Sequence, residues 1–172
     1  MTDAAGRPQI AVCGPGDASP TALTLAEAIG AALGRWGATL VCGGLGGCME
    51  AACRGAKAAG GTTVGVIPGY DARAANPYVD HVVCTGMGQA RNAIVAASGA
   101  AVIVIAGGAG TLSEAAMAIR LGRPVVLIGD WPPSLAAEMV TMAGRTASLQ
   151  TAREPDEAVG LALKMAGEAP PS

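Results

Sequence analysis

The sequence contains no phenylalanine, and aromatic residues of all kinds make up only 2% of its 172 residues. Lysine and arginine together number 11 and form no cluster. The chain therefore lacks both the basic stripe and the stacking platforms with which proteins bind nucleic acid, and we expect no nucleic-acid partner. No apolar run approaches the ~20 residues that a membrane-spanning helix requires, so we expect no membrane span either.

Histidine occurs once, as His81, and no C-x-x-C motif is present. Because these are the usual zinc ligands, we expect no metal site, and we expect His81 to be an ordinary strand-edge residue. The five cysteines are odd in number and no signal peptide is evident, which indicates a reducing cytoplasm. Cys13, Cys42 and Cys84 lie in apolar, strand-like runs that predict buried thiols, whereas Cys48 and Cys53 fall on a predicted helix.

The composition, with 51% hydrophobic and 14% charged residues, predicts a compact protein, and the length fits one domain over 1–172 with loose ends at 1–7 and 167–172. Apolar runs alternate with helically periodic segments along the chain. The expected strands are 9–13, 38–42, 63–67, 79–85, 100–106, 124–128 and 146–149. The expected helices are 20–36, 48–59, 89–98, a helix from the glycine turn at 107–111 to about 121, one ending near 143, and 154–166.

This alternation predicts an α/β protein, with a Rossmann-like, doubly wound parallel sheet in three α/β/α layers. In such sheets ligands bind at the carboxyl ends of the strands, at the switch point. Three glycine-rich turns follow predicted strands, at 14–16, 43–47 and 107–111. If they converge, they form one cleft whose amides face an anion such as a phosphate.

The turn at 107–111 carries the strongest local signal. It connects a buried strand to a helix, and its glycines let the backbone turn tightly and come close to a ligand. The helix that follows directs free N–H groups and a positive dipole end toward the turn. Thr111 can add a hydroxyl, and Glu114 can accept from sugar hydroxyls. Thr111 and Glu114 also match a capping box, in which both side chains only satisfy the helix's own amides.

Several nucleotide-binding motifs are missing. The run 14–19 lacks the third glycine of G-x-G-x-x-G, and no acidic residue closes the second strand, which disfavours an NAD or FAD enzyme. There is no P-loop motif and no G-x-S-x-G elbow, which disfavours P-loop ATP or GTP hydrolysis and acyl transfer.

Over residues 10–128 the chain resembles the LOG-like family, often labelled lysine-decarboxylase-like, and within it the branch of molybdenum-cofactor carrier proteins. The resemblance rests on motifs in a characteristic order: Gly14-Pro15-Gly16, Gly43-Gly44-x-Gly46-Gly47-x-Met49, Gly65-Val66-Ile67-Pro68-Gly69, Arg91-Asn92 and Gly107-Gly108-x-Gly110-Thr111-x-x-Glu114. It implies a homodimer. It also implies that ligand or phosphate binding uses Gly14, Gly16, Gly43, Gly44, Gly46, Gly47, Met49, Gly107, Gly108, Gly110 and Thr111.

In LOG enzymes the arginine and glutamate that match Arg91 and Glu114 are catalytic and cleave the N-glycosidic bond of nucleoside monophosphates. This chain departs from the enzyme pattern, because Ala106 replaces a proline, and 87–92 keeps the arginine but not the histidine and lysine. These differences favour the carrier branch, which implies a bound phosphorylated pterin, the molybdenum cofactor, as ligand. The alternative function is a phosphoribohydrolase that acts through Glu114 and Arg91, and the third option is a protein that binds phosphate only adventitiously. For Arg91 itself, the alternative is an arginine that is merely solvated on a helix surface.

Overall fold

The computed structural model describes residues 6–143 and 148–167 and contains one seven-stranded sheet in the order β4-β3-β2-β1-β5-β6-β7. Every pair of neighbouring strands is parallel. The strands are β1 (Gln9–Cys13), β2 (Thr39–Cys42), β3 (Thr62–Ile67), β4 (His81–Cys84), β5 (Ala101–Ile105), β6 (Val125–Ile128) and β7 (Leu149–Ala152). The expected α/β fold with a doubly wound parallel sheet is confirmed.

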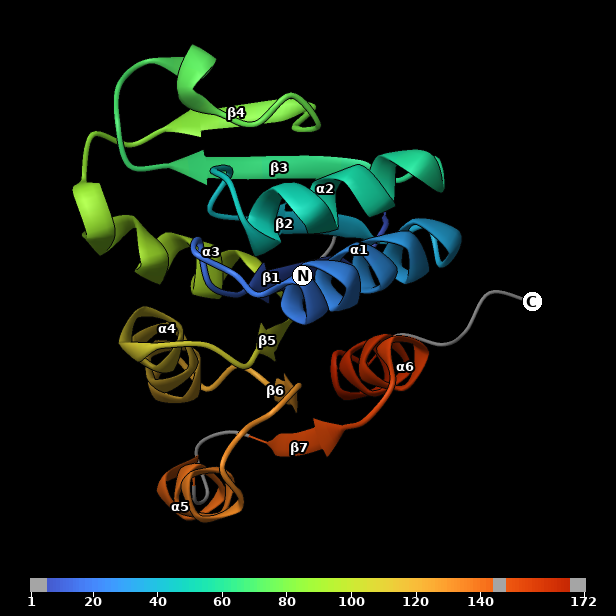
Figure 1. Ribbon diagram of the computed structural model, residues 1–172, viewed down its shortest axis with the longest axis vertical. Helices are drawn as coiled ribbons and strands as arrows, with labels where there is room; N and C mark the ends of the chain where they lie inside the picture. Colours follow the sequence, from blue (N-terminus) through green and yellow to red (C-terminus); the bar gives the residue numbers. More distant parts are fainter. Residues whose placement is uncertain (1–5, 144–147, 168–172) are drawn as a thin grey trace.

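Helices cover both faces of this sheet, as Figure 1 shows. One face carries α1 (Pro20–Arg35), α2 (Cys48–Ala58) and α6 (Pro155–Met165). The other carries α3 (Asn92–Ser98), α4 (Ala109–Arg120) and α5 (Pro133–Ala143). Short 3-10 turns, η1 (Ala72–Ala74) and η2 (Gly88–Arg91), interrupt the two connections around β4.

The central strands are fully buried because helices pack on both sides of them. Ile10, Leu40 and Ile103 point to the face covered by α1 and α2, and Val41 and Val104 point to the face covered by α3 and α4. This two-sided burial explains why the runs at 10–13 and 101–105 are continuously apolar rather than alternating. Among the described residues, most of the core consists of isoleucine, valine, leucine and alanine, with four cysteines and Met139.

Glycine allows α1 and α2 to pack backbone against backbone. A Cβ on Gly30 would lie 1.9 Å from the Ala52 carbonyl oxygen, and a Cβ on Gly55 would lie 1.9 Å from the Glu27 carbonyl oxygen. Neither position can accept a larger residue without moving a helix. The close contact fixes α2, whose first turn faces the carboxyl edge of the sheet.

Three sequence-based expectations need correction. Cys84 is exposed, because β4 is an edge strand with little covering it, whereas Cys13 and Cys42 are buried as expected. The last strand is Leu149–Ala152 instead of 146–149, and 146 and 147 lie outside the described residues. The helix expected at 89–98 is a 3-10 turn followed by the shorter α3.

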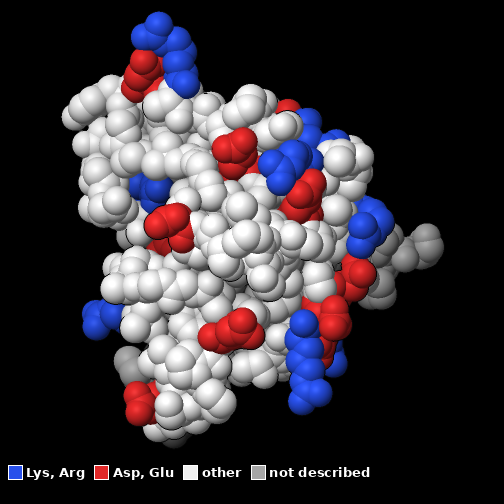
Figure 2. Space-filling view, viewed as in Figure 1, with Lys and Arg blue, Asp and Glu red and all other residues white. Residues whose placement is uncertain are grey.

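His81 opens the edge strand β4 and is exposed, as a strand-edge residue should be. Among the described residues, no helix has both the length and the apolar character needed to cross a membrane. Figure 2 shows acidic and basic side chains interspersed on the visible face of the described chain. Of the loose ends expected at 1–7 and 167–172, residues 1–5 and 168–172 lie outside the described residues.

Candidate functional site

Three glycine-rich bends meet at the carboxyl edge of the sheet, beside the switch point between β1 and β5. The amide of Cys48 donates to the Pro15 carbonyl oxygen at 3.0 Å, which joins the bend after β2 to the bend after β1. A Cβ on Gly47 would lie 2.2 Å from the Gly16 carbonyl oxygen. A Cβ on Gly107 would lie 2.9 Å from Pro15 Cδ, which joins the bend after β5 to the same loop. The expected convergence is therefore confirmed.

A cavity of about 420 Å³ opens between these bends. Its size suits a small-molecule ligand. It is lined by Gly14, Pro15, Gly16, Asp17, Leu45, Met49, Gln89, Arg91, Asn92, Gly108, Gly110, Thr111 and Glu114. These residues come from loops and helices on both faces of the sheet, so only the folded topology brings them together.

Helix α4 begins at this cavity. Its N-cap is Gly108, and the first helical bond runs from the Leu112 amide to the Gly108 carbonyl oxygen at 3.1 Å. The amides of residues 109–111 therefore precede the hydrogen-bonded ladder and lie at the positive end of the helix dipole. The capping-box interpretation is wrong, because the helix starts two residues before Thr111 and its cap uses no side-chain hydrogen bond. Thr111 and Glu114 instead line the cavity.

Arg91 lies at the base of the cavity and is buried, with 5% of its side chain exposed. Its Nη2 donates to the Gly43 carbonyl oxygen at 3.3 Å, and its Nη1 donates to Asn92 Oδ1. The Nε group is buried and has no hydrogen-bond partner among the described residues. The interpretation of Arg91 as a solvated surface residue is therefore wrong.

The position of Arg91 depends on a glycine in another bend. A Cβ on Gly43 would lie 2.5 Å from Arg91 Nη2 and 2.7 Å from Met49 Sδ. The absence of that Cβ lets the guanidinium reach the backbone carbonyl. Gly43 thus acts behind the cavity wall, by making room for a residue that lines it.

Glu114 faces Arg91 across the cavity, with 4.0 Å between Glu114 Oε1 and Arg91 Nη1. Burial raises the pKa of Glu114 to about 7, and the nearby Arg91 charge opposes this rise only in part. At the end of β1, burial and the Glu114 charge raise the pKa of Cys13 well above its usual value. The base of the cavity is therefore a poorly solvated region in which adding negative charge is costly.

The candidate residues divide into two groups by position. Those that line the cavity are Gly14, Gly16, Met49, Arg91, Gly108, Gly110, Thr111 and Glu114. Those that shape the bends around it are Gly43, Gly44, Gly46, Gly47 and Gly107, and Gly107 lines a neighbouring cavity of about 270 Å³. The sequence-based set missed five lining residues, namely Pro15, Asp17, Leu45, Gln89 and Asn92. Four of them lie inside or next to the motifs quoted above, so their closeness in sequence to those motifs could have identified them as lining residues.

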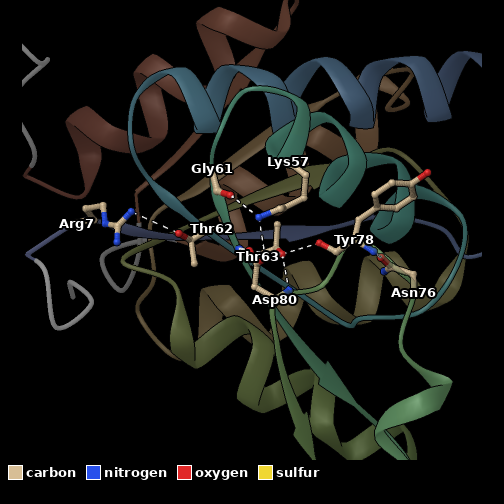
Figure 3. Close-up of polar contacts among 8 residues, drawn as sticks. All are labelled: Arg7, Lys57, Gly61, Thr62, Thr63, Asn76, Tyr78 and Asp80. Atoms are coloured by element: carbon tan, nitrogen blue, oxygen red, sulfur yellow. Dashed lines mark hydrogen bonds and ion pairs between the residues drawn. The ribbon is translucent and has the colours of Figure 1, made fainter.

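A polar network outside the cavity holds the bend after β2 in place, and Figure 3 shows two of its members, Asn76 and Tyr78. Asn76 donates from its backbone amide to the Gly44 carbonyl oxygen at 2.9 Å and from Nδ2 to the Leu45 carbonyl oxygen at 3.0 Å. Asn76 Oδ1 in turn accepts from the Tyr78 amide at 3.1 Å. The loop between β3 and β4 thereby fixes the residue, Leu45, that forms one wall of the cavity.

The fold and the site together define a Rossmann-like α/β protein with a ligand-sized cavity at its switch point. A family model described as the SLOG cluster4 family matches residues 7–159, and the chain belongs to this family. The expected membership of a LOG-like, carrier-type family is thereby confirmed.

Solved structures with similar chains include two molybdenum-cofactor proteins. The chain is 36% identical to the molybdenum cofactor binding protein from Rippkaea orientalis, with a TM-score of 0.82 and coverage of 90% of this chain and 94% of that one. It is 33% identical to the molybdenum cofactor carrier protein of Chlamydomonas reinhardtii, with a TM-score of 0.85 and coverage of 94% and 99%. An uncharacterized protein of Archaeoglobus fulgidus is 39% identical over 117 residues, which are 68% of this chain and 77% of that protein.

Proposed function

We propose that this protein binds the molybdenum cofactor, a phosphorylated pterin, and carries it without transforming it. The observation that carries the proposal is the cavity of about 420 Å³ at the first turn of α4, in a chain that resembles two molybdenum-cofactor proteins over 90% or more of its length. In this proposal the amides of residues 109–111 and the Thr111 hydroxyl hold the phosphate. Arg91, which lines the cavity and is buried, supplies positive charge.

The rest of the cavity suits a heterocycle with N–H donors. Asp17 and Gln89 line it and offer oxygen acceptors, while Leu45 and Met49 offer apolar surface. A pterin carries amino and ring N–H groups on an otherwise flat, polarisable ring, so it needs both kinds of contact. Gly14, Gly16, Gly108 and Gly110 let the backbone approach such a ligand without side chains in between.

Gly110 provides a sharp test. Nothing lies within 4 Å of the position of its Cβ, so Gly110→Leu adds a side chain to the cavity without a clash inside the protein. Gly160, on α6, has equally open surroundings and does not line the cavity, so Gly160→Leu is the matched control. We expect fluorescent pterin to copurify with the wild type and with Gly160→Leu but to be lost from Gly110→Leu. Equal loading of all three proteins would refute the proposal.

A phosphoribohydrolase is the alternative function, and the placement of Glu114 and Arg91 in one cavity favours it. In that reaction a carboxylate stabilises the positive charge that builds on the ribose as the N-glycosidic bond breaks. Incubation with AMP or isopentenyladenosine monophosphate separates the two functions. If the wild type releases free base and Glu114→Gln does not, the enzyme is supported. If the wild type releases no free base but binds pterin, the carrier is supported. Failure of both assays leaves adventitious phosphate binding.

We also propose that the protein is a cytoplasmic homodimer, with the segment around Arg91 near the interface. The family resemblance supports the dimer, and the odd number of cysteines, all free in the structure, supports a reducing compartment. Light scattering on the purified protein tests the dimer. A monomer at micromolar concentration would reject it.

A further inference from the structure

Two buried cysteines that the proposed function does not use lie in contact directly behind the cavity wall. Cys42 ends β2, Cys53 lies on α2, and their sulfur atoms are 3.5 Å apart. A disulfide needs about 2.05 Å between sulfurs, so the pair must close by about 1.5 Å. Both side chains are fully buried, and the other buried cysteines, Cys13 and Cys48, have no sulfur-to-sulfur contact among those the structure records for the described residues.

The pair is connected to the cavity through the backbone of the same bend. The Gly44 amide donates to Cys42 Sγ at 3.3 Å, and the preceding residue, Gly43, supplies the carbonyl oxygen that holds Arg91. Met49, which lines the cavity, has its carbonyl oxygen 4.0 Å from Cys42 Sγ. A displacement of Cys42 therefore acts on two residues of the cavity, Arg91 and Met49.

The surroundings also distinguish the two sulfurs. Contact with Cys53 lowers the pKa of Cys42 against the effect of burial, with help from the Gly44 amide and the Arg91 charge, while the same contact and burial raise the pKa of Cys53. Cys42 is thus the better nucleophile, since the thiolate is the reactive form, and Cys53 is placed to resolve its oxidised product.

We propose that Cys42 and Cys53 form a reversible disulfide with a hydroperoxide as oxidant, and that this oxidation weakens ligand binding in the adjoining cavity. In the first step Cys42 Sγ attacks the peroxide, an S–O bond forms, the O–O bond breaks, and the departing hydroxide takes a proton to become water. In the second step Cys53 gives up its proton and attacks Cys42 Sγ. The S–S bond forms, the S–O bond breaks, and a second water leaves. Two thiols lose two electrons, and one hydrogen peroxide becomes two waters.

Formation of the disulfide draws α2 and the end of β2 together. It also makes Cys42 Sγ a weaker acceptor for the Gly44 amide. We expect the Gly43 carbonyl and the Met49 side chain to shift, and the cavity to bind its ligand at least fivefold more weakly. Because linkage is reciprocal, bound ligand should disfavour the disulfide at equilibrium by the same factor.

The test uses the full chain with Cys84→Ser, because Cys84 is exposed and would otherwise react first. After treatment with hydrogen peroxide, intact mass should fall by about 2 Da, one disulfide linking two thiols with loss of two hydrogens. A peptide linking Cys42 to Cys53 should appear, and dithiothreitol should reverse both changes. Adding Cys53→Ser should abolish them, whereas adding Cys48→Ser, a buried cysteine outside the pair, should not.

Binding is measured in the same samples with the oxidised, fluorescent pterin phosphate derived from the cofactor, which carries no thiol that peroxide could consume. Weaker binding after oxidation, restored by dithiothreitol, supports the inference. It is overturned if the linked peptide does not form, or if it forms and the affinity is unchanged. The affinity arm rests on the proposed function. If the reduced protein binds no pterin phosphate, that function fails, and the linked peptide still decides whether the disulfide forms.

Discussion

Neutralising Glu114 should make the stability of the protein less dependent on pH. The pKa of the carboxyl group is about 7 in the folded protein and 4.5 in its ordinary state, so the folded protein holds the proton more tightly than the unfolded chain between these values. Stability therefore falls as pH rises through this window and stays low above it. Integrating the linkage gives a cost of about 0.8 kcal/mol at pH 5 and about 3.3 kcal/mol at pH 8.

Glu114→Gln keeps the shape of the side chain and removes its titration. We expect the free energy of unfolding of the variant, relative to wild type, to rise by about 2.5 kcal/mol between pH 5 and pH 8. Urea denaturation of both proteins at several pH values measures this difference.

Glu27 supplies the control, because Arg54 lowers the pKa of this exposed carboxyl group and the sign is reversed. Relative to wild type, Glu27→Gln should lose a small amount of stability as pH rises toward 4.5, and the difference should stay nearly constant between pH 5 and pH 8. A pH-independent difference between Glu114→Gln and wild type would show that the carboxyl group is ionised and well solvated in the folded protein, and the electrostatic reasoning about the cavity would fail.

Three further predictions concern the glycines and Asn76. Gly55→Ala should destabilise the protein by about 1–3 kcal/mol, because the new Cβ would lie 1.9 Å from the Glu27 carbonyl oxygen. Gly160→Ala, in open surroundings, should stabilise it by about 0.5–1 kcal/mol. Thermal denaturation compares the two variants, and equal effects would refute the packing argument. Gly43→Ala should displace Arg91 and weaken pterin binding at least tenfold. Gly46→Ala, whose Cβ would be 3.9 Å from its nearest neighbour, should change the affinity less than twofold. Fluorescence titration measures both affinities, and similar values for the two variants would contradict the prediction. Asn76→Ala should cost about 1–3 kcal/mol of stability, because the Leu45 carbonyl oxygen loses its hydrogen-bond donor. Hydrogen exchange at residues 43–47 should also accelerate, and unchanged exchange would exclude a positioning role for Asn76.

Residues that act locally could be predicted from the sequence, and those that act through tertiary contacts could not. Alternating strands and helices predicted the sheet and its edge, and the glycine spacing predicted the bends that meet there. Cys84 shows one limit, because an apolar run reads the same on an exposed edge strand as on a central strand. Arg91 shows another, because its burial results from a missing Cβ on Gly43, 48 residues away in the chain.

The capping pattern at Thr111 and Glu114 failed for a related reason. The pattern predicts a cap only where the helix begins at Thr111, and here α4 begins at Ala109, so that both side chains are free to face the cavity. A motif of four residues cannot show where the helix around it begins.

The protonation of Glu114 also weighs between the two functions. A hydrolase needs the ionised carboxylate at the moment when positive charge develops on the ribose. In this cavity burial raises the pKa of Glu114 to about 7, and a phosphate bound at the start of α4 would raise it further, because like charges disfavour one another. A phosphate bound there would thus disfavour the form that catalysis requires. A carrier has no such conflict, since a protonated Glu114 can donate a hydrogen bond to the ligand, and its binding should then weaken as pH rises above 7. Base release from AMP that increases steeply with pH, together with pterin binding that does not change with pH, would reverse this assignment.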